Sequence, residues 1–310
     1  MNMQSETSYP LRKTRDFGLT ISDTLLFVKG NWKGLLLMYF IFIVPFLVVG
    51  TLVGAESLGE FFYEMFSKSN DIFSFQFMEH APMVGLSLLC YMIAGVLYPT
   101  LVYIYMERYE AGEGQTPTLQ ECASRLFLIG LSNCGYVLVT SFGFILMAMI
   151  IVIPVLGAII FIFGFFYLVV AFSMLIPVNT IEDRPFPFAY RRSIELVMGR
   201  WWYTLGVTVV LFLIYYFFAM IIGFVSTMVS GLSSVNFLDP NAASQIFTKK
   251  YFLVSGLSAI VQQIFYLLIH VGLGIHYFSL REDKDGTGLE ARLDQLGNDS
   301  RKNGHPDEEY

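Results

Sequence analysis

The stretch that decides the fold is residues 131–178, LSNCGYVLVTSFGFILMAMIIVIPVLGAIIFIFGFFYLVVAFSMLIPV, which contains no Asp, Glu, Lys or Arg. As one helix it would be about 72 Å long at ~1.5 Å per residue. That is more than twice the roughly 30 Å of hydrocarbon in a bilayer. The segment must therefore fold back, and Pro154 with Gly157 offers the turn. It predicts a hairpin of two membrane-spanning helices.

Six apolar stretches of this kind occur in the chain: residues 34–53, 82–106, 131–152, 157–178, 202–225 and 251–278. Each is long enough for one crossing, which takes about 20 residues. Of the 310 residues, 55% are apolar and only 14% are charged, and the mean hydropathy of +0.60 excludes an ordinary soluble domain. We therefore expect an all-α polytopic membrane protein with six transmembrane helices.

The basic residues are distributed unevenly between the two sides of these spans. One side holds 16 of the 19 Lys and Arg residues. The opposite side holds only Lys68, Lys249 and Lys250. Basic loops stay in the cytoplasm, so we expect a multi-pass protein of the bacterial cytoplasmic (inner) membrane with both termini cytoplasmic. The net charge is −6, because acids balance the basic residues. Nothing therefore indicates a nucleic-acid partner.

An internal repeat organises the expected membrane domain, residues 19–278. A short amphipathic segment and a glycine, Gly30, Gly130 or Gly199, precede spans one, three and five. This pattern predicts three repeats of interfacial amphipathic helix plus helical hairpin, at about 19–106, 118–178 and 187–278, with a bend at each glycine. Chance similarity is the alternative to repetition, and a continuous extension of each span is the alternative to a bend. Residues 1–18 and the polar tail 279–310 are expected to be cytoplasmic.

Candidate binding residues fall into two groups. Arg191, Arg192, Arg200, Trp201 and Trp202 form the densest basic and aromatic cluster on the cytoplasmic side. Guanidinium groups bind phosphate bidentately and indoles anchor at headgroup depth, so this cluster predicts a contact with lipid headgroups. The alternative is that these residues only orient the protein in the membrane and anchor it at the interface, which requires the same residue types.

The second group, Gln262, Gln263 and His270, lies within the sixth span. It predicts either a polar cavity or hydrogen bonds between helices, since lipid offers polar groups no partner. His276 lies about 240° around the helix from His270, so the two imidazoles make a poor metal pair. The chain also lacks the usual nucleotide, zinc-protease and hydrolase motifs. We therefore expect no catalytic residue, no metal and no cofactor.

Three segments carry a resemblance: RDFGLTISDT (15–24), RSIELVMGRWW (192–202) and KDGTGLEARLDQLG (284–297). Together they resemble bacterial polytopic proteins related to the membrane domain of glycerophosphodiester phosphodiesterases, and the tail is similar to that of members from Bacteroidetes. In that family the membrane domain is sometimes fused to a soluble catalytic barrel. No barrel follows here, so the resemblance implies no phosphodiesterase activity, and it transfers no site residue.

The sequence thus predicts a non-enzymatic inner-membrane scaffold or assembly partner in envelope maintenance. Its expected partners are membrane lipids, another membrane protein or a second copy of the chain. The alternative is a lipid-handling or small-solute transport protein with a cavity between repeats, which Gln262, Gln263 and His270 would line. An intramembrane enzyme is a third reading, and it would need a bound metal or a histidine-centred pocket.

Overall fold

The computed structural model describes residues 10–67, 75–112, 114–153, 155–183, 187–231 and 248–286. Within these ranges all regular structure is helical. Six of their helices are long and apolar enough to span a membrane: Phe17–Phe42, His80–Ala111, Leu119–Ala148, Leu156–Glu182, Trp201–Ser230 and Lys249–Asp285. The predicted all-α, multi-pass fold is confirmed.

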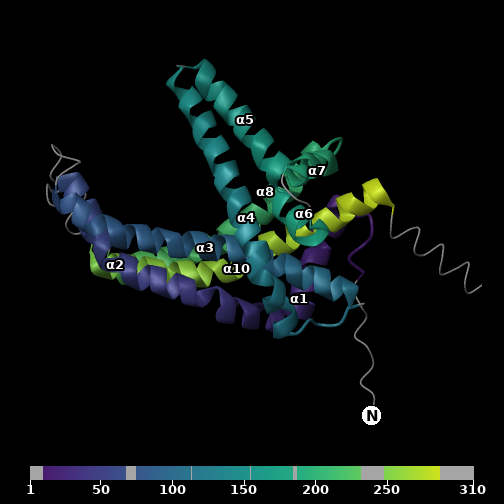
Figure 1. The fold of residues 1–310 in the computed structure, drawn as a ribbon, viewed down its shortest axis with the longest axis horizontal. Coiled ribbons are helices and arrows are strands. Elements are labelled where there is room, and N and C mark those ends of the chain that lie inside the picture. Colours follow the sequence, from purple (N-terminus) through teal and green to yellow (C-terminus); the bar gives the residue numbers. More distant parts are fainter. Residues whose placement is uncertain are drawn as a thin grey trace, which may run out of the picture.

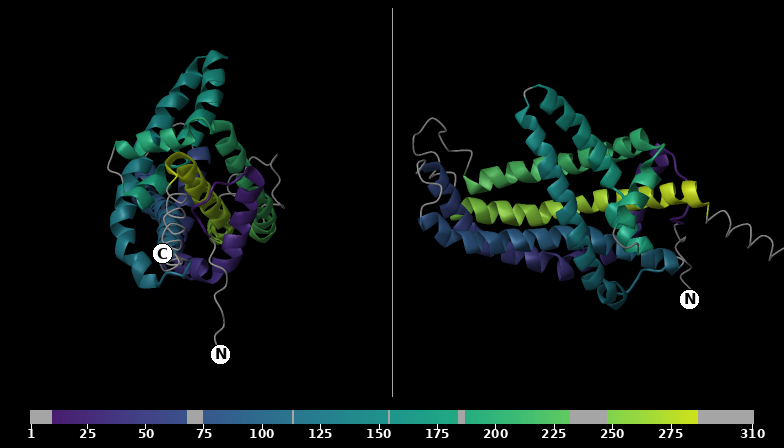
Figure 2. Two further views of the ribbon diagram at one scale, coloured as in Figure 1. Left: turned by 90° about the vertical axis from the view of Figure 1, so that its right-hand side faces the viewer. Right: turned by 45° about the horizontal axis from the view of Figure 1, so that its top comes forward.

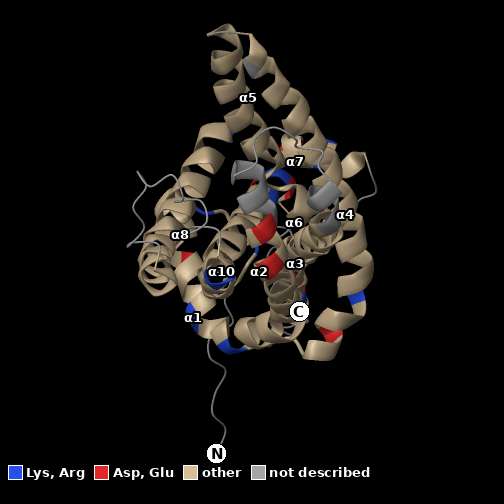
Figure 3. Ribbon diagram, turned by 90° about the vertical axis from the view of Figure 1, so that its left-hand side faces the viewer, with Lys and Arg blue, Asp and Glu red and all other residues tan. Residues whose placement is uncertain are grey.

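An elongated bundle makes up most of the molecule (Figure 1). It contains α2 (Val44–Ser67), α3 (Phe75–Ala111), α8 (Trp201–Ser230) and α10 (Lys249–Asp285). Helix α2 packs along α3, and α10 packs against both α8 and α2. Viewed from the end where α2 and α3 meet, the helices are almost entirely uncharged, with only short blue and red segments (Figure 3). Their outer surfaces therefore suit contact with lipid.

The hairpin predicted within residues 131–178 is present and diverges steeply from the bundle (Figures 1 and 2). It consists of α4 (Leu119–Ala148), the short 3-10 helix η1 (Met149–Val152) and α5 (Leu156–Phe172). At its tip a Cβ on Gly157 would lie 2.0 Å from the carbonyl oxygen of Ile150. Only glycine fits this turn. Large apolar side chains such as Val152 and Phe163 are 83% and 73% exposed, so the hairpin presents apolar surface on its outside.

The first predicted span, residues 34–53, is divided between two helices. Helix α1 (Phe17–Phe42) ends at Ile43, and α2 begins at Val44. Pro45 explains the division, because it lacks a backbone N–H and its ring clashes with the preceding turn of helix. Amides of the next two residues, Phe46 and Leu47, donate to the carbonyl of Ile43. The predicted span is thus interrupted at Ile43.

The three repeat glycines behave differently. Helices α1 and α4 run without interruption through Gly30 and Gly130, so in these two units the structure shows the alternative, a continuous helical extension. A Cβ on Gly130 would lie 2.6 Å from Leu97 Cδ2, so this glycine lets α3 pack close to α4. Gly199 alone of the three separates two helices, α7 (Phe188–Val197) and α8, and it has φ +88°.

Small residues set the packing distance inside the bundle. A Cβ on Gly256 of α10 would lie 2.3 Å from the side chain of Thr51, and one on Gly272 would lie 2.5 Å from Leu211. Such contacts are typical of membrane helices, which gain little from the hydrophobic effect and associate through close packing. Helix α10 continues past the predicted boundary at 278 to Asp285. The rest of the predicted tail, 287–310, lies outside the described residues.

Candidate functional site

The candidate site lies where the hairpin joins the bundle. Helix α5 ends at Phe172, the short α6 (Leu175–Glu182) follows, and α7 then leads into α8. One face of α7 is buried, through Ala189, Ser193, Leu196 and Val197. The hydroxyl of Ser193 donates to the carbonyl of Ala171 at 2.7 Å, which fixes α7 against the end of α5. The amphipathic pattern of this segment thus produces a short helix across the base of the hairpin.

A tight turn places two tryptophans beside α5. Helix α7 ends when the amide of Met198 donates to the carbonyl of Ile194, and Arg200 then donates to Val197. Between them Gly199 has a left-handed backbone with φ +88°, a conformation that favours glycine. Trp201 and Trp202 start α8 immediately afterwards.

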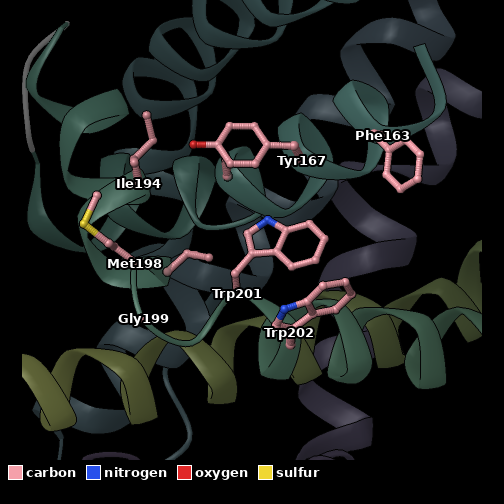
Figure 4. Close-up of a pocket in the computed structure, with 9 residues that line it drawn as sticks. Phe163, Tyr167, Ile194, Met198, Gly199, Trp201 and Trp202 are labelled. Atoms are coloured by element: carbon pink, nitrogen blue, oxygen red, sulfur yellow. The ribbon is translucent and has the colours of Figure 1, made fainter. Parts of the chain in front are cut away.

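An apolar pocket of about 480 Å³ forms between α5, α7 and the start of α8. Its lining residues are Phe163, Tyr167, Ala171, Ile194, Val197, Met198, Gly199, Trp201 and Trp202. In Figure 4 the two indoles face Phe163 and Tyr167 of α5 across this space. Phe163, Tyr167 and Ala171 are spaced four residues apart, so the α5 wall extends about 12 Å along the helix at ~1.5 Å per residue.

Trp201 brings one polar group to this apolar pocket. Its Nε1 atom is buried and makes no hydrogen bond with a described residue. In Figure 4 the edge that carries this nitrogen is turned towards Tyr167. A buried donor without an acceptor costs about 1–3 kcal/mol. An acceptor brought in by a ligand would therefore be favoured there. Trp202 packs edge-on against Trp201 and is 79% exposed.

Two of the three predicted phosphate-binding arginines pair with carboxylates at the end of α10. Arg192 Nη2 bonds Asp285 at 2.5 Å, and Arg200 Nη2 bonds Asp283 at 2.6 Å. Arg192 also pairs with Glu182 at 3.2 Å. Burial acts to lower the pKa of Arg192, but the hydrogen bonds and charges of Asp285 and Glu182 outweigh it, and the pKa is raised above its ordinary value. Both guanidinium groups are thus already neutralised within the protein.

Arg191 differs from its two neighbours. Its side chain is exposed, and it forms no ion pair with the residues that the structure describes. It lines a small surface pocket on α7 with Phe188, Arg192 and Glu195. The predicted cluster therefore divides into two paired arginines, one unpaired arginine, and two tryptophans that line the apolar pocket.

The second predicted group lies along α10. His270 is 8% exposed, and its ring lies among those of Tyr98, Tyr103 and Tyr266, with centroids 4.8–6.5 Å away. Gln262 and Gln263 are half-buried on α10. None of the three lines the apolar pocket, the surface pocket on α7 or the pocket between α4 and α6.

A buried polar cluster that the sequence analysis overlooked joins α3, α4 and α6. Asn133 is fully buried and donates to Thr100 at 2.8 Å and to Thr180 at 3.2 Å. Asn179 donates to Asn133 Oδ1 at 2.8 Å and to Ser132 at 3.2 Å. The signal was available, because an asparagine in an apolar span needs partners from neighbouring helices.

The N-terminal segment is anchored by a second unforeseen cluster. Arg15, whose side chain is fully buried, bonds Asp23 at 2.7 Å and the carbonyls of Leu11 and Pro10 at 2.6 and 2.8 Å. Its backbone amide donates to Ser279 of α10 at 2.9 Å. Burial lowers the pKa of Arg15 to about 10, which leaves it charged at neutral pH. The start of α1 is therefore held against the end of α10.

The described part of the chain contains no group of three or more His, Cys, Asp or Glu that could hold a metal ion. We found no match between this chain and any family model, curated protein or solved structure.

Proposed function

We propose that this chain is a non-enzymatic membrane protein that handles lipid, and that it binds an acyl chain in the apolar pocket between α5, α7 and α8. The observation that carries this proposal is the pocket itself. Its volume of about 480 Å³ lies within the usual range for small-molecule sites, about 300–1,000 Å³. Its lining is almost entirely hydrocarbon and aromatic, which suits an acyl chain better than a polar solute.

Two features support a phospholipid as the occupant. The Trp201 N–H has no acceptor among the described residues, and an ester or phosphate oxygen of a lipid could accept its hydrogen bond. The unpaired Arg191 lies on α7, the helix that contributes Ile194 to the pocket wall. An exposed guanidinium at headgroup depth attracts lipid phosphate. Arg192 and Arg200 contribute less, because carboxylates already neutralise them.

The proposed location is the bacterial cytoplasmic membrane, with both termini in the cytoplasm. The excess of Lys and Arg on one side of the spans supports this orientation. The hydrogen bond from Arg15 to Ser279 is consistent with it, because it joins the start of α1 to the end of α10. We also retain, as proposals, the threefold repeat and a relationship to the membrane domain of glycerophosphodiester phosphodiesterases. The three segments that resemble that family support the relationship.

A scaffold or assembly role is the second candidate, and the hairpin favours it. Helices α4 and α5 diverge from the bundle (Figure 2) and expose large apolar side chains, among them Phe127 at 75% and Phe142 at 61%. Such surfaces can pack against helices of another membrane protein as well as against lipid.

Pocket filling separates these two candidates. Ile194→Trp places an indole in the apolar pocket, and Val209→Trp is the matched control, because Val209 is 42% exposed on α8 and does not line the pocket. After extraction into detergent and removal of loosely bound lipid, native mass spectrometry counts the phospholipids that each chain retains. We expect Val209→Trp to retain as many phospholipids as the wild type and Ile194→Trp to retain one fewer. Equal retention by both variants would reject the acyl-chain pocket.

A further inference from the structure

A second pocket, of about 230 Å³, lies between α4 and α6 and is lined by side chains of both charges. Its lining residues are Arg125, Leu128, Ile129, Ser132, Asn179 and Asp183, and none of them lines the acyl-chain pocket. We propose that this pocket binds a phosphoethanolamine headgroup, with Asp183 binding the ammonium group and Arg125 the phosphate. The site is separate from the proposed acyl-chain pocket and does not depend on it.

Asp183 supplies an available carboxylate. It ends α6 with φ +49°, a left-handed backbone that few residues other than glycine adopt and that Asp and Asn tolerate best. Its side chain is exposed and forms no ion pair with a described residue. Strained residues of this kind gather at binding sites, where the surrounding structure holds them in place.

Arg125 retains donors for a phosphate. Its Nη1 atom bonds both carboxylate oxygens of Glu107, at 2.6 and 2.7 Å. These bonds leave Nε and Nη2 of the guanidinium fork for another acceptor. Arg192 differs, because all three of its guanidinium nitrogens face carboxylates. Because Glu107 neutralises Arg125, Asp183 gives the pocket a net negative charge. A headgroup that carries an ammonium group fits this balance, whereas a purely anionic headgroup does not.

The neighbouring polar cluster fixes the inner wall of the pocket. Asn179 is 5% exposed, and its amide nitrogen bonds Asn133 and Ser132. Residues of α3, α4 and α6 therefore hold the pocket residues Ser132 and Asn179 in position. The volume lies below the range of about 300–1,000 Å³ that is typical of whole small-molecule ligands. It suits a small polar headgroup instead.

An apolar stripe on α4 favours a membrane lipid over a soluble source of the same headgroup. It continues from the pocket along one face of the helix at spacings of three and four residues. With Gly135 in register, its exposed members are Leu128, Leu131, Leu138, Phe142 and Ile145, and the exposed Met149 at the start of η1 continues the spacing. Acyl chains of a lipid whose headgroup occupies the pocket would lie along this stripe.

The test compares short-chain lipids on the detergent-solubilised full chain. Dioctanoyl phosphatidylethanolamine should bind at least roughly tenfold more tightly than dioctanoyl phosphatidylglycerol. The affinity of the Asp183→Asn variant for dioctanoyl phosphatidylethanolamine should be about tenfold lower than that of the wild type. This is the loss expected for one charge-assisted hydrogen bond. Asparagine also tolerates the left-handed backbone, so this variant should remain folded. Glu195→Gln is the matched control, since Glu195 is an exposed acid that does not line the pocket.

Three results would overturn the proposal. The first is equal affinity of the wild type for the two lipids, and the second is an unchanged affinity for phosphatidylethanolamine in Asp183→Asn. The third concerns the source of the headgroup: phosphoethanolamine alone, binding as tightly as the lipid, would reject a membrane ligand. Ile194→Trp, which fills only the acyl-chain pocket, should leave the preference for phosphatidylethanolamine intact. Failure of one site is therefore distinguishable from failure of the other.

Discussion

The ion pair between Arg15 and Asp23 should be one of the strongest local determinants of stability. The side chains are 0% and 4% exposed, and Nε lies 2.7 Å from Oδ2. Removing one partner of a buried pair typically costs about 3–5 kcal/mol, because the remaining charge stays buried without compensation. Because Lys13 still pairs with Asp23 after the change, we expect Arg15→Met to lower the free energy of unfolding by about 3 kcal/mol, the lower end of this range.

Lys13 provides the matched control for Arg15→Met. It bonds the same carboxylate oxygen of Asp23, at 3.0 Å, but its side chain is 30% exposed. Pairs with one solvated partner are worth about 0–1 kcal/mol. Lys13→Met should therefore cost less than about 1 kcal/mol, although both variants remove one positive charge next to Asp23. The free energies can be measured by reversible unfolding in mixed micelles with increasing SDS.

A double-mutant cycle with Asp23→Asn tests the reasoning directly. If the cost of each single change comes from the stranded partner, the double variant should be more stable than the two single costs predict, by about 1–3 kcal/mol. Additive costs would refute the buried-pair account, and so would equal losses in Arg15→Met and Lys13→Met. Because the pKa of Arg15 in the folded protein is about 10, Arg15 is protonated in both states below pH 9. It should therefore add no pH dependence to stability between pH 6 and 8.

Three further predictions concern orientation, packing and the intramembrane histidine. When an impermeant reagent is added to intact cells, it should label a cysteine placed at Asn241 and leave a cysteine placed at Ser300 unlabelled. The reverse pattern would invert the proposed topology. Gly157→Ala should destabilise the protein by about 1–3 kcal/mol, because its Cβ would meet the backbone of Ile150. Gly143→Ala, which meets nothing within 4 Å, should be neutral or stabilising in the same unfolding assay. His270→Gln should leave proton flux in reconstituted liposomes unchanged, since the imidazole packs among tyrosine rings. A flux present in the wild type and lost in this folded variant would favour a transporter.

Apolarity alone predicts the six spans, because a segment without charges has few alternatives to crossing the membrane. The break at Ile43 was also predictable in principle, since Pro45 lies within the first stretch. The glycines were less informative. Gly130 and Gly199 occupy matching sequence positions, yet Gly130 receives the side chain of Leu97, whereas Gly199 ends a helix. The surrounding helices decide between these outcomes, and a single sequence does not reveal them.

The arginine cluster shows the same limit at the candidate site. The sequence places Arg192 and Arg200 in a basic and aromatic cluster, but their partners, Asp285 and Asp283, lie more than 80 residues away in sequence. Because these carboxylates already bind Arg192 and Arg200, two of the three predicted phosphate ligands contribute less to binding lipid phosphate. What remains is the exposed Arg191 on α7, the helix that contributes Ile194 to the aromatic pocket. Recognition of the proposed lipid should therefore depend more on the shape of that pocket than on net positive charge, and raising the salt concentration should weaken binding only slightly.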